Sequence, residues 1–435
     1  LPEVRLPRDD DYVEAARELL ARATKAQLRS AGRVGALMSG GLDSPAVAIT
    51  ALSHLQSAGE TLPVFTWVPE PGWDGLAPEF SYGDETPYVQ AIAAMHPGLE
   101  VHFVRAEGLG HYHLLDEFIR AAEVTPRNAL NMCWVHDIHA RARSQGICVL
   151  LCGAVGNVTL SWSGMGACIE LWRQRRFRAL ARELTAGART PVDVALNIWR
   201  DLLHPLGPDW LFALRSRLLD PHVRGPRWRR FSAINPAYAE RMHIAERAAH
   251  FGFNFFGKLP SDLRALRRGV LTDGAILELG DAAQGLRALH GIEMRDPMCD
   301  RRLVEWSLGV PEEQFRRNGV RRWLIKRMMK GRLPESVLRN PRKGRQTVDW
   351  HCRMTRDLPR IKKDLDRLEA DPNTARMIDI PRLRRLLDDW PERTVISRFD
   401  DRSFFLPVIV PMTLAAGHFV RWVNGANDPA LEQGI

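Results

Sequence analysis

The sequence predicts an α/β fold, in which a parallel, twisted sheet has helices on both faces and a mostly helical C-terminal region follows. Short β-like runs alternate with patterns of helical period in the first part of the chain, whereas from about residue 168 onward Trp, Leu and Arg recur at helical spacing. Short buried strands that alternate with helices are typical of a parallel sheet covered on both sides. Ligands of such sheets bind beyond the carboxyl ends of the strands.

The expected elements follow one another in a regular order. Apolar side chains three or four positions apart predict a first amphipathic helix at residues 12–23. The runs that we expect to form strands lie at residues 34–38, 62–68, 99–104 and 147–152. Helical patterns separate them at residues 45–57, 85–96 and 131–145. We therefore expect an α/β domain at residues 1–167 and a helical region at residues 168–435.

Composition and length restrict the class of protein. With 45 % hydrophobic and 26 % charged residues among 435, the chain has globular composition and is long enough to bury a large core. No apolar stretch reaches the roughly 20 residues of a membrane span, and the first residues do not resemble a signal segment. We therefore expect no membrane partner and a cytoplasmic location. The six cysteines include no Cys-x-x-Cys pair, so we expect reduced structural thiols and no cysteine metal site.

The chain is also basic. Its 61 Lys and Arg against 52 Asp and Glu give a formal charge of +9, and a positive field attracts polyanions or acidic peptides. Arginines cluster at residues 173–178, 224–230 and 264–268. Nucleic-acid binding uses such clusters, but helices with solvated arginine faces contain them too. We favour the second interpretation and expect no nucleic-acid partner.

Segment 39–45, Ser-Gly-Gly-Leu-Asp-Ser-Pro, follows the first predicted strand. Its glycines permit a tight turn, and Pro45 suits the first position of a helix that Ser44 caps. Backbone N–H groups at a helix N-terminus, together with two serine hydroxyls, suit a phosphate or pyrophosphate. Asp43 would repel bound phosphates unless a cation lies between them, so we infer Mg²⁺ there. Neither Gly-x-x-x-x-Gly-Lys-Ser/Thr nor Gly-x-Gly-x-x-Gly occurs in the chain.

The string Ser-Gly-Gly-x-Asp-Ser resembles the pyrophosphate loop (PP-loop) of the ATP pyrophosphatases, which have a HUP-like α/β fold. Members of that family cleave ATP between the α and β phosphates and adenylate a substrate. The resemblance implies ATP and Mg²⁺ as cofactors, with Asp43 as the metal ligand. The residues implied in binding ATP or pyrophosphate are Leu37, Ser39, Gly40, Gly41, Leu42, Asp43, Ser44, Thr66 and Gly153.

Two later segments, at residues 291–315 and 319–350, resemble the synthetase domain of the asparagine synthetase superfamily. The resemblance implies that segment 290–350 returns to the active site and that the helical region completes a peptide-binding cleft. Asparagine synthetases also carry an N-terminal glutaminase domain, and we expect that domain to be absent from this chain.

Segment 152–164, CGAVGNVTLSWSG, departs from the asparagine synthetases. They have Gly-Glu-Gly-Ala-Asp-Glu here, so Ala154 replaces the glutamate and Asn157 replaces a metal-binding aspartate. β-Lactam synthetases place a tyrosine at the position of Ala154. The pattern Gly-x-x-Gly-Asn-x-Thr-x-Ser instead resembles the lasso peptide cyclases, as do segments 126–134, 295–306 and 340–350.

That resemblance implies ATP-dependent macrolactam formation. The side-chain carboxylate of an Asp or Glu in a core peptide is adenylated, and the N-terminal amine of the peptide then closes the ring. An adenylated carboxylate is an electrophile, and an α-amine of pKa about 8 is partly neutral at pH 7. The implied partners are the precursor (core) peptide, a leader peptidase and a leader-recognition protein.

The resemblance also implies roles for single residues. The residues implied in catalysis are Arg342, which stands where related synthetases have a lysine, and Lys343, Glu293 and Asn157. Those implied in substrate binding are Asn128, Asn131, Glu85, Arg295, Thr159 and Ser161. Structural roles are the alternatives: a solvated basic turn at 342–343, an ion pair between Glu293 and Arg295, helix caps at the asparagines, and a first-turn acid at Glu85. For Asn157 a hydrogen bond to peptide or phosphate is the alternative to metal binding.

Three other functions remain as alternatives. An asparagine synthetase or β-lactam synthetase-like ligase would use a small acid, and Ala154 and Asn157 disfavour it. A tRNA-modifying PP-loop enzyme would explain the positive charge but not the resemblance of segment 291–350. A catalytically inactive scaffold would keep the loop only to bind nucleotide.

Overall fold

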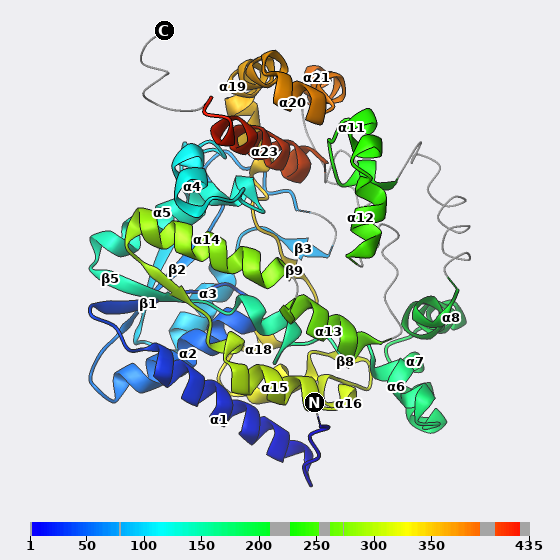
Figure 1. Ribbon diagram of the computed structural model, residues 1–435. Coiled ribbons are helices and arrows are strands. Elements are labelled where there is room, and N and C mark those ends of the chain that lie inside the picture. Colours follow the sequence, from blue (N-terminus) through cyan, green and yellow to red (C-terminus); the bar gives the residue numbers. More distant parts are fainter. Residues whose placement is uncertain are drawn as a thin grey trace.

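The computed structural model describes residues 2–77, 80–208, 227–251, 262–272, 274–391 and 405–426. It confirms the α/β class. Helices cover both faces of a central sheet, and a group of C-terminal helices packs beside it (Figure 1).

The central sheet has five strands in the order β4-β2-β1-β5-β6, and all neighbouring pairs are parallel. The strands are β1 (Arg33–Leu37), β2 (Leu62–Trp67), β4 (Leu99–Val104), β5 (Ile147–Leu151) and β6 (Glu293–Arg295). The first four confirm the predicted runs. Every residue of the inner strand β2 is buried, as expected for a strand with helices on both sides.

The fifth strand, β6, comes from the region for which the sequence predicts only helices. It has three residues, Glu-Met-Arg, and so short a segment shows no measurable alternation of apolar and polar side chains. Val149 of β5 pairs with Glu293, and Leu151 pairs with Arg295. The chain therefore leaves β6 at the carboxyl edge of the sheet, beside the loop that follows β5.

The helices predicted at 12–23, 45–57, 85–96 and 131–145 are confirmed with small shifts of their ends. They are α1 (Asp9–Gln27), α2 (Asp43–Gln56), α3 (Thr86–Met95) and α5 (Met132–Ser144). Helices α1, α2 and α3 share the first hydrophobic core with one face of the sheet, together with α15 (Arg301–Gly309) and α17 (Trp323–Met328). Helices α5 and α14 (Gly274–His290) cover the other face (Figure 1).

The rest of the chain is mainly helical, as expected. Further described helices are α4 (Leu115–Ala122), α6 (Ala167–Arg173), α7 (Phe177–Thr185), α8 (Pro191–Ile198), α11 (Pro236–Arg241), α12 (Ile244–His250), α13 (Leu263–Thr272), α16 (Glu312–Phe315), α18 (Glu335–Leu338), α19 (Trp350–Ala370), α20 (Pro372–Met377), α21 (Ile380–Asp388) and α23 (Val410–Val423). Two short strands matter for the site, because β3 (Ser81–Tyr82) pairs in parallel with β9 (Lys343–Gly344).

A second core lies between α19, α21 and α23. The helical segment Phe405–Val423 is, by length and composition alone, apolar enough to cross a membrane. Its buried residues, among them Val410 and Leu414, belong to this second core, and Gly417 lies against Leu368 of α19. The second core therefore buries part of this helix, 39 % of its most apolar window.

The arginine clusters differ from one another. Residues 173–178 are exposed, as expected for a solvated turn, and residues 224–226 lie outside the described residues. The expectation of a solvated face is wrong for Arg267, whose side chain is buried and lies over the rings of Trp162 and Phe315, with centroid distances of 5.0 and 4.8 Å. Its guanidinium donates to the carbonyl of Val158 (3.1 Å) and faces Glu312 at 3.7 Å. Burial lowers the pKa of Arg267 to about 10. This arginine therefore supports the loop after β5 through its hydrogen bond to the carbonyl of Val158.

Candidate active site

The PP-loop, residues 39–44, turns the chain from β1 into α2. The N–H of Ser39 donates to Ser44 Oγ (2.9 Å), and the two serine hydroxyls also lie 2.9 Å apart. Helix α2 begins at Asp43 with Leu42 at its N-cap, so the expectation that Ser44 caps the helix is wrong. Ser44 lies within the first turn, and its hydroxyl closes the loop instead. The N–H groups at the start of α2 form the kind of positive helix end that binds anions.

Glu85 fixes the PP-loop through a hydrogen bond to its backbone. Its Oε2 accepts a hydrogen bond from the N–H of Gly40 (3.1 Å). Burial raises the pKa of Glu85 to about 7, although the bond from Gly40 acts in the opposite direction. An ideal Cβ on Gly40 would lie 2.7 Å from the Cβ of Tyr88 on α3, so the close approach of α3 requires glycine here.

The loop after β5 contacts the start of α2 through two glycines. An ideal Cβ on Gly153 would lie 3.0 Å from the carbonyl carbon of Asp43, and one on Gly156 would lie 2.4 Å from Asp43 Oδ1. Thr159 is buried, and its hydroxyl donates to the carbonyl of Val155 (3.1 Å). Ser161 is also buried and approaches the Asp43 carboxylate. Two of the predicted substrate-binding side chains thus lie beneath this loop.

Ala154 and Asn157 of the same loop are exposed. The amide oxygen of Asn157 accepts a hydrogen bond from Arg322, with 3.0 Å between Oδ1 and Nη2. Arg322 is the N-cap residue of α17, and Lys326 lies one turn further along the same helix. The charge of Arg322 lowers the pKa of Lys326 in addition to the larger effect of burial, so the two side chains lie close together. The sequence predictions did not include these two cations at the site.

A second carboxylate that the predictions omitted lies opposite Asp43. Asp296 directly follows β6, and its two oxygens accept hydrogen bonds from the N–H groups of Met298 and Val155, each at 2.8 Å. Burial raises the pKa of Asp296 to about 6, and the nearby charge of Asp43 adds to the effect. Burial also raises the pKa of Asp43. Two carboxylates that are buried near each other repel when both are charged, so a bound cation is favoured.

Strand β9, which belongs to segment 290–350, pairs in parallel with β3. The N–H of Lys343 donates to the carbonyl of Phe80 (3.0 Å), and an ideal Cβ on Gly344 would lie 2.6 Å from Glu85 Oε1. Arg342 and Lys343, two and one residues before Gly344, have exposed side chains on this ribbon. Both cations thus belong to the segment whose Gly344 contacts Glu85.

Asn131 supports the same segment. Its side-chain amide donates to Gln346 Oε1 (2.8 Å), and its oxygen accepts a hydrogen bond from the hydroxyl of Thr347. Asn128, in contrast, is exposed and precedes the short 3₁₀ turn Ala129–Asn131, where its carbonyl accepts from the N–H of Asn131 (2.8 Å). Only Asn131 is thus joined to the site by its side chain.

Other predicted residues have structural contacts. Glu293 and Arg295 form an ion pair (2.9 Å), and Arg295 also donates to the carbonyl of Gln27 at the end of α1. The hydroxyl of Thr66 donates to the carbonyl of Met38, just before the PP-loop (2.8 Å). Leu37 ends β1, and Leu42 is buried in the first core. These side chains position the loop and the sheet edge.

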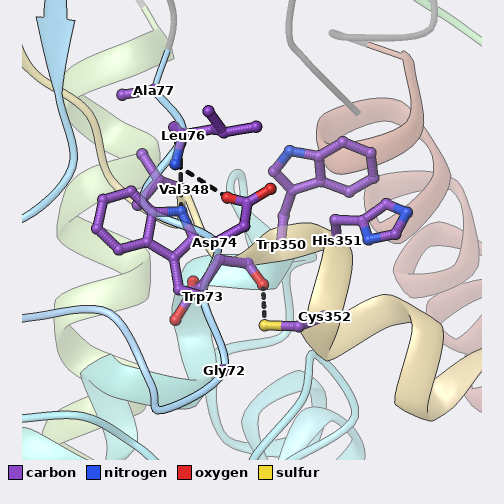
Figure 2. Close-up of a pocket in the computed structure, with 10 residues that line it drawn as sticks. Gly72, Trp73, Asp74, Leu76, Ala77, Val348, Trp350, His351 and Cys352 are labelled. Atoms are coloured by element: carbon purple, nitrogen blue, oxygen red, sulfur yellow. Dashed lines mark hydrogen bonds between the residues drawn. The ribbon is translucent and has the colours of Figure 1, made fainter. Parts of the chain in front are cut away.

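A pocket of about 70 Å³ lies between segment 72–77 and the start of α19. Figure 2 shows the rings of Trp73 and Trp350 on either side of the Asp74 carboxylate, with Cys352 below them in this view. Gly83, which follows β3, packs closely against two residues of the pocket, because an ideal Cβ there would lie 2.5 Å from Val348 and 2.8 Å from Trp73. The pocket is therefore a small recess whose lining combines two indole rings with the polar side chains of Asp74 and His351.

The donor set suits a magnesium nucleotide. Asp43 Oδ1 is buried and has no hydrogen-bond partner among the described residues, which suits a carboxylate that binds Mg²⁺. Within the described ranges, no group of three or more His, Cys, Asp or Glu is placed to hold a metal ion. Helix α2, Arg322 and Lys326 supply positive charge for phosphate oxygens. The chemistry that fits is activation of a carboxylate by ATP.

Comparison with known proteins gives one further finding. The family model described as asparagine synthase matches residues 15–412. That range contains the PP-loop, the loop after β5, Asp296 and the 342–350 segment. No curated protein matches the chain.

Proposed function

Because the chain belongs to the asparagine synthase family, whose members are ATP-dependent, AMP-forming amide ligases, we propose that it closes a macrolactam ring in a peptide, as a lasso peptide cyclase. The proposed acceptor is the side-chain carboxylate of an Asp or Glu, and the proposed nucleophile is the N-terminal amine of the same peptide. We also propose that the reaction takes place in the cytoplasm, with a leader peptidase and a leader-recognition protein as partners.

One observation carries the finer part of this proposal, namely the uncharged rim formed by Ala154 and Asn157. Both residues are exposed on the loop after β5, and Asn157 is engaged by Arg322. A ligase for a free amino acid needs a carboxylate to bind the α-ammonium group of that substrate. A peptide amine that acts as nucleophile must be neutral, and a nearby carboxylate would raise its pKa. An amide and a methyl group at the rim therefore favour the peptide amine.

The proposed reaction has two steps. A carboxylate oxygen of the peptide attacks the α-phosphorus of ATP, the bond to the bridging oxygen breaks, and pyrophosphate leaves. The amine then attacks the acyl carbon, loses a proton, and AMP leaves as the isopeptide bond forms. Mg²⁺, when bound at Asp43, neutralises charge on the leaving pyrophosphate.

The residues of this chain act mainly by positioning. The first turn of α2 binds the phosphates, and Glu85 keeps Gly40 in place through its hydrogen bond. Arg322 and Lys326 face the site from α17, where they stabilise negative charge that develops on the phosphates or on the acyl oxygen. Holding the peptide folded before ring closure is the largest task, because each ordered residue costs about 1–2 kcal/mol.

The test is reconstitution with linear peptides. The purified chain, ATP and Mg²⁺ are incubated with core peptides that carry a free N-terminus and an internal Asp or Glu. We expect a product that is lighter by one water in mass spectrometry, with one AMP and one pyrophosphate released per ring. Asp43→Ala should abolish ring closure without loss of fold, whereas Asp137→Ala, which removes a surface partner of Arg141, should cyclise normally.

Two results would contradict the proposal. AMP formation that requires aspartate or another small acid, and ignores every peptide, would favour a small-acid ligase. Binding of ATP with no AMP release in the presence of any acid or peptide would favour an inactive scaffold.

A further inference from the structure

Asp43 and Asp296 reach the same turn from two sides. Residues Val155 and Gly156 form part of the 3₁₀ turn Ala154–Val158 that follows β5. Asp296 accepts a hydrogen bond from the N–H of Val155 (2.8 Å), and Asp43 Oδ1 touches the position where a Cβ on Gly156 would stand (2.4 Å). Met298 completes the contact, since its sulfur lies 2.7 Å from the same Cβ position. The two carboxylates are therefore neighbours, although 253 positions separate them in the sequence.

The space between these residues contains polar atoms without partners. Asp43 Oδ1 is buried and unpartnered among the described residues. Ser161 is 1 % exposed, and its hydroxyl lies near Asp43 but makes no hydrogen bond of normal geometry within the described chain. A carboxylate and a hydroxyl left unsatisfied in a buried site cost free energy unless a ligand completes them.

Asn157 does not serve as the second ligand in this arrangement. Its amide oxygen already accepts a hydrogen bond from Arg322, and the guanidinium would repel a divalent cation bound beside it. Asp296 accepts hydrogen bonds from the backbone N–H groups of Val155 and Met298, and each of its carboxylate oxygens keeps a second lone pair. Mg²⁺ prefers such carboxylate oxygens and usually binds one or two of them in addition to phosphates.

We propose that Asp296 is the second carboxylate of the magnesium–nucleotide site, so that Asp43 and Asp296, at the ends of β1 and β6, bind the cation together. The proposal rests on the proposed function only in taking ATP as the nucleotide. It places the second acidic ligand on the segment after β6 in place of the loop after β5. The Ser161 hydroxyl lies beside the Asp43 carboxylate.

The test measures binding without any peptide, so that it does not depend on the reaction. Mn²⁺ is titrated into the full chain with α,β-methylene-ATP, an analogue that the enzyme cannot cleave, and bound Mn²⁺ is followed by electron paramagnetic resonance. We expect Asp296→Asn to weaken Mn²⁺ binding by at least the roughly 10- to 100-fold that loss of an outer-shell partner costs. Asp43→Asn should have an effect of similar size.

Asp300→Asn is the matched control. Asp300 is also a helix-capping aspartate, four residues further on, and it accepts from the N–H of Arg302 (3.0 Å) outside the site. It should lower the melting temperature about as much as Asp296→Asn and leave Mn²⁺ binding unchanged. Mn²⁺ binding that survives Asp296→Asn, or that is lost instead in Asn157→Ala, would overturn the proposal. If Mn²⁺ binding follows the prediction while no peptide is cyclised, only the proposed function fails.

Discussion

Replacement of Gly156 by alanine tests the geometry of the site with a single methyl group. Gly156 lies in the turn after β5, and an ideal Cβ there would lie 2.4 Å from Asp43 Oδ1. Ordinary contacts between a carbon and an oxygen are about 3.3 Å. The Asp43 carboxylate would therefore have to retreat by about 0.9 Å, the difference between these two distances.

The expected loss follows from this displacement. A misplacement of about 1 Å in an active site costs on the order of 10²-fold in rate. The colliding atoms are the ends of the Asp43 and Met298 side chains, which can move without any shift of the backbone. We therefore expect Gly156→Ala to lower kcat/KM for AMP formation by about 10²-fold and to leave the melting temperature nearly unchanged.

Gly285→Ala provides a control with the same overlap away from the site. An ideal Cβ on Gly285 of α14 would lie 2.4 Å from the Cβ of Ala122 on α4. Both atoms are fixed close to the backbone, so the helices must separate, and overpacking of this kind costs about 1–3 kcal/mol. This variant should melt at a lower temperature, while its folded fraction keeps the kcat/KM of the wild type.

The assay measures AMP release at several peptide and ATP concentrations, together with thermal unfolding of each variant. A Gly156→Ala protein with wild-type kcat/KM would refute the placement of Asp43 in the site. A loss of activity equal to the loss of folded protein in both variants would show that the effect at Gly156 is only structural.

Two further predictions concern pH. Burial lowers the pKa of His136 to about 3 and that of His139 to about 4, below the unfolded value of about 6.5. The unfolded chain therefore binds more protons than the folded chain below pH 6.5. The stability that comes from keeping these histidines neutral is present above that pH and is lost as the pH falls. The melting temperature of His136→Gln should consequently fall less between pH 6.5 and 4 than that of the wild type. Conversely, although burial opposes it, hydrogen bonds to Asp116 and Asp364 raise the pKa of His418 to about 9. The contribution of His418 to stability is complete below pH 6.5 and is lost as the pH rises through about 9. His418→Gln should therefore be destabilised most below pH 6.5 and should approach the stability of the wild type above pH 9. Equal melting temperatures of the variant and the wild type at pH 6 would contradict this.

The contiguous part of the site was predictable because its signal is local. Ser39, the two glycines and Asp43 stand next to one another after an apolar run, and the turn between strand and helix requires those residue types. The helix start was misplaced, since Asp43 itself enters the first turn and Ser44 bonds back to Ser39. A serine near a helix start can bond either to a backbone N–H of the helix or back to the preceding loop, and the local sequence does not show which.

The distant part of the site could not be derived in this way. Glu293 and Arg295 stand two positions apart in β6, which places them on one face of the sheet and lets them pair with each other. The next residue, Asp296, lies beyond the strand and turns back to Val155. A strand of three residues gives no periodic signal, so the sequence pointed to the right segment and missed the carboxylate by one position.

Arg322 illustrates the same limit. Basic residues at 322 and 326 stand four apart, which is the spacing of neighbours on one helix face, and this signal was available in the sequence. The sequence contains many such arginine pairs, however, and only packing of α17 against α1 and the first core selects this one. The choice depends on long-range contacts rather than on the local pattern.

Under the proposed function, the positions of the acids and cations favour an amine nucleophile. Asp43 and Asp296 lie deep, around the turn after β5, whereas the exposed rim carries Ala154 and Asn157. Negative charge is thereby concentrated where a divalent cation can neutralise it, and the rim is left without a carboxylate. An amine that reaches the rim meets the guanidinium of Arg322, which lowers the pKa of a neighbouring ammonium. A site whose second carboxylate is Asp296, at the end of β6, in place of an acid at the rim would therefore keep the metal site. It would at the same time favour the neutral amine that attacks the acyl-adenylate.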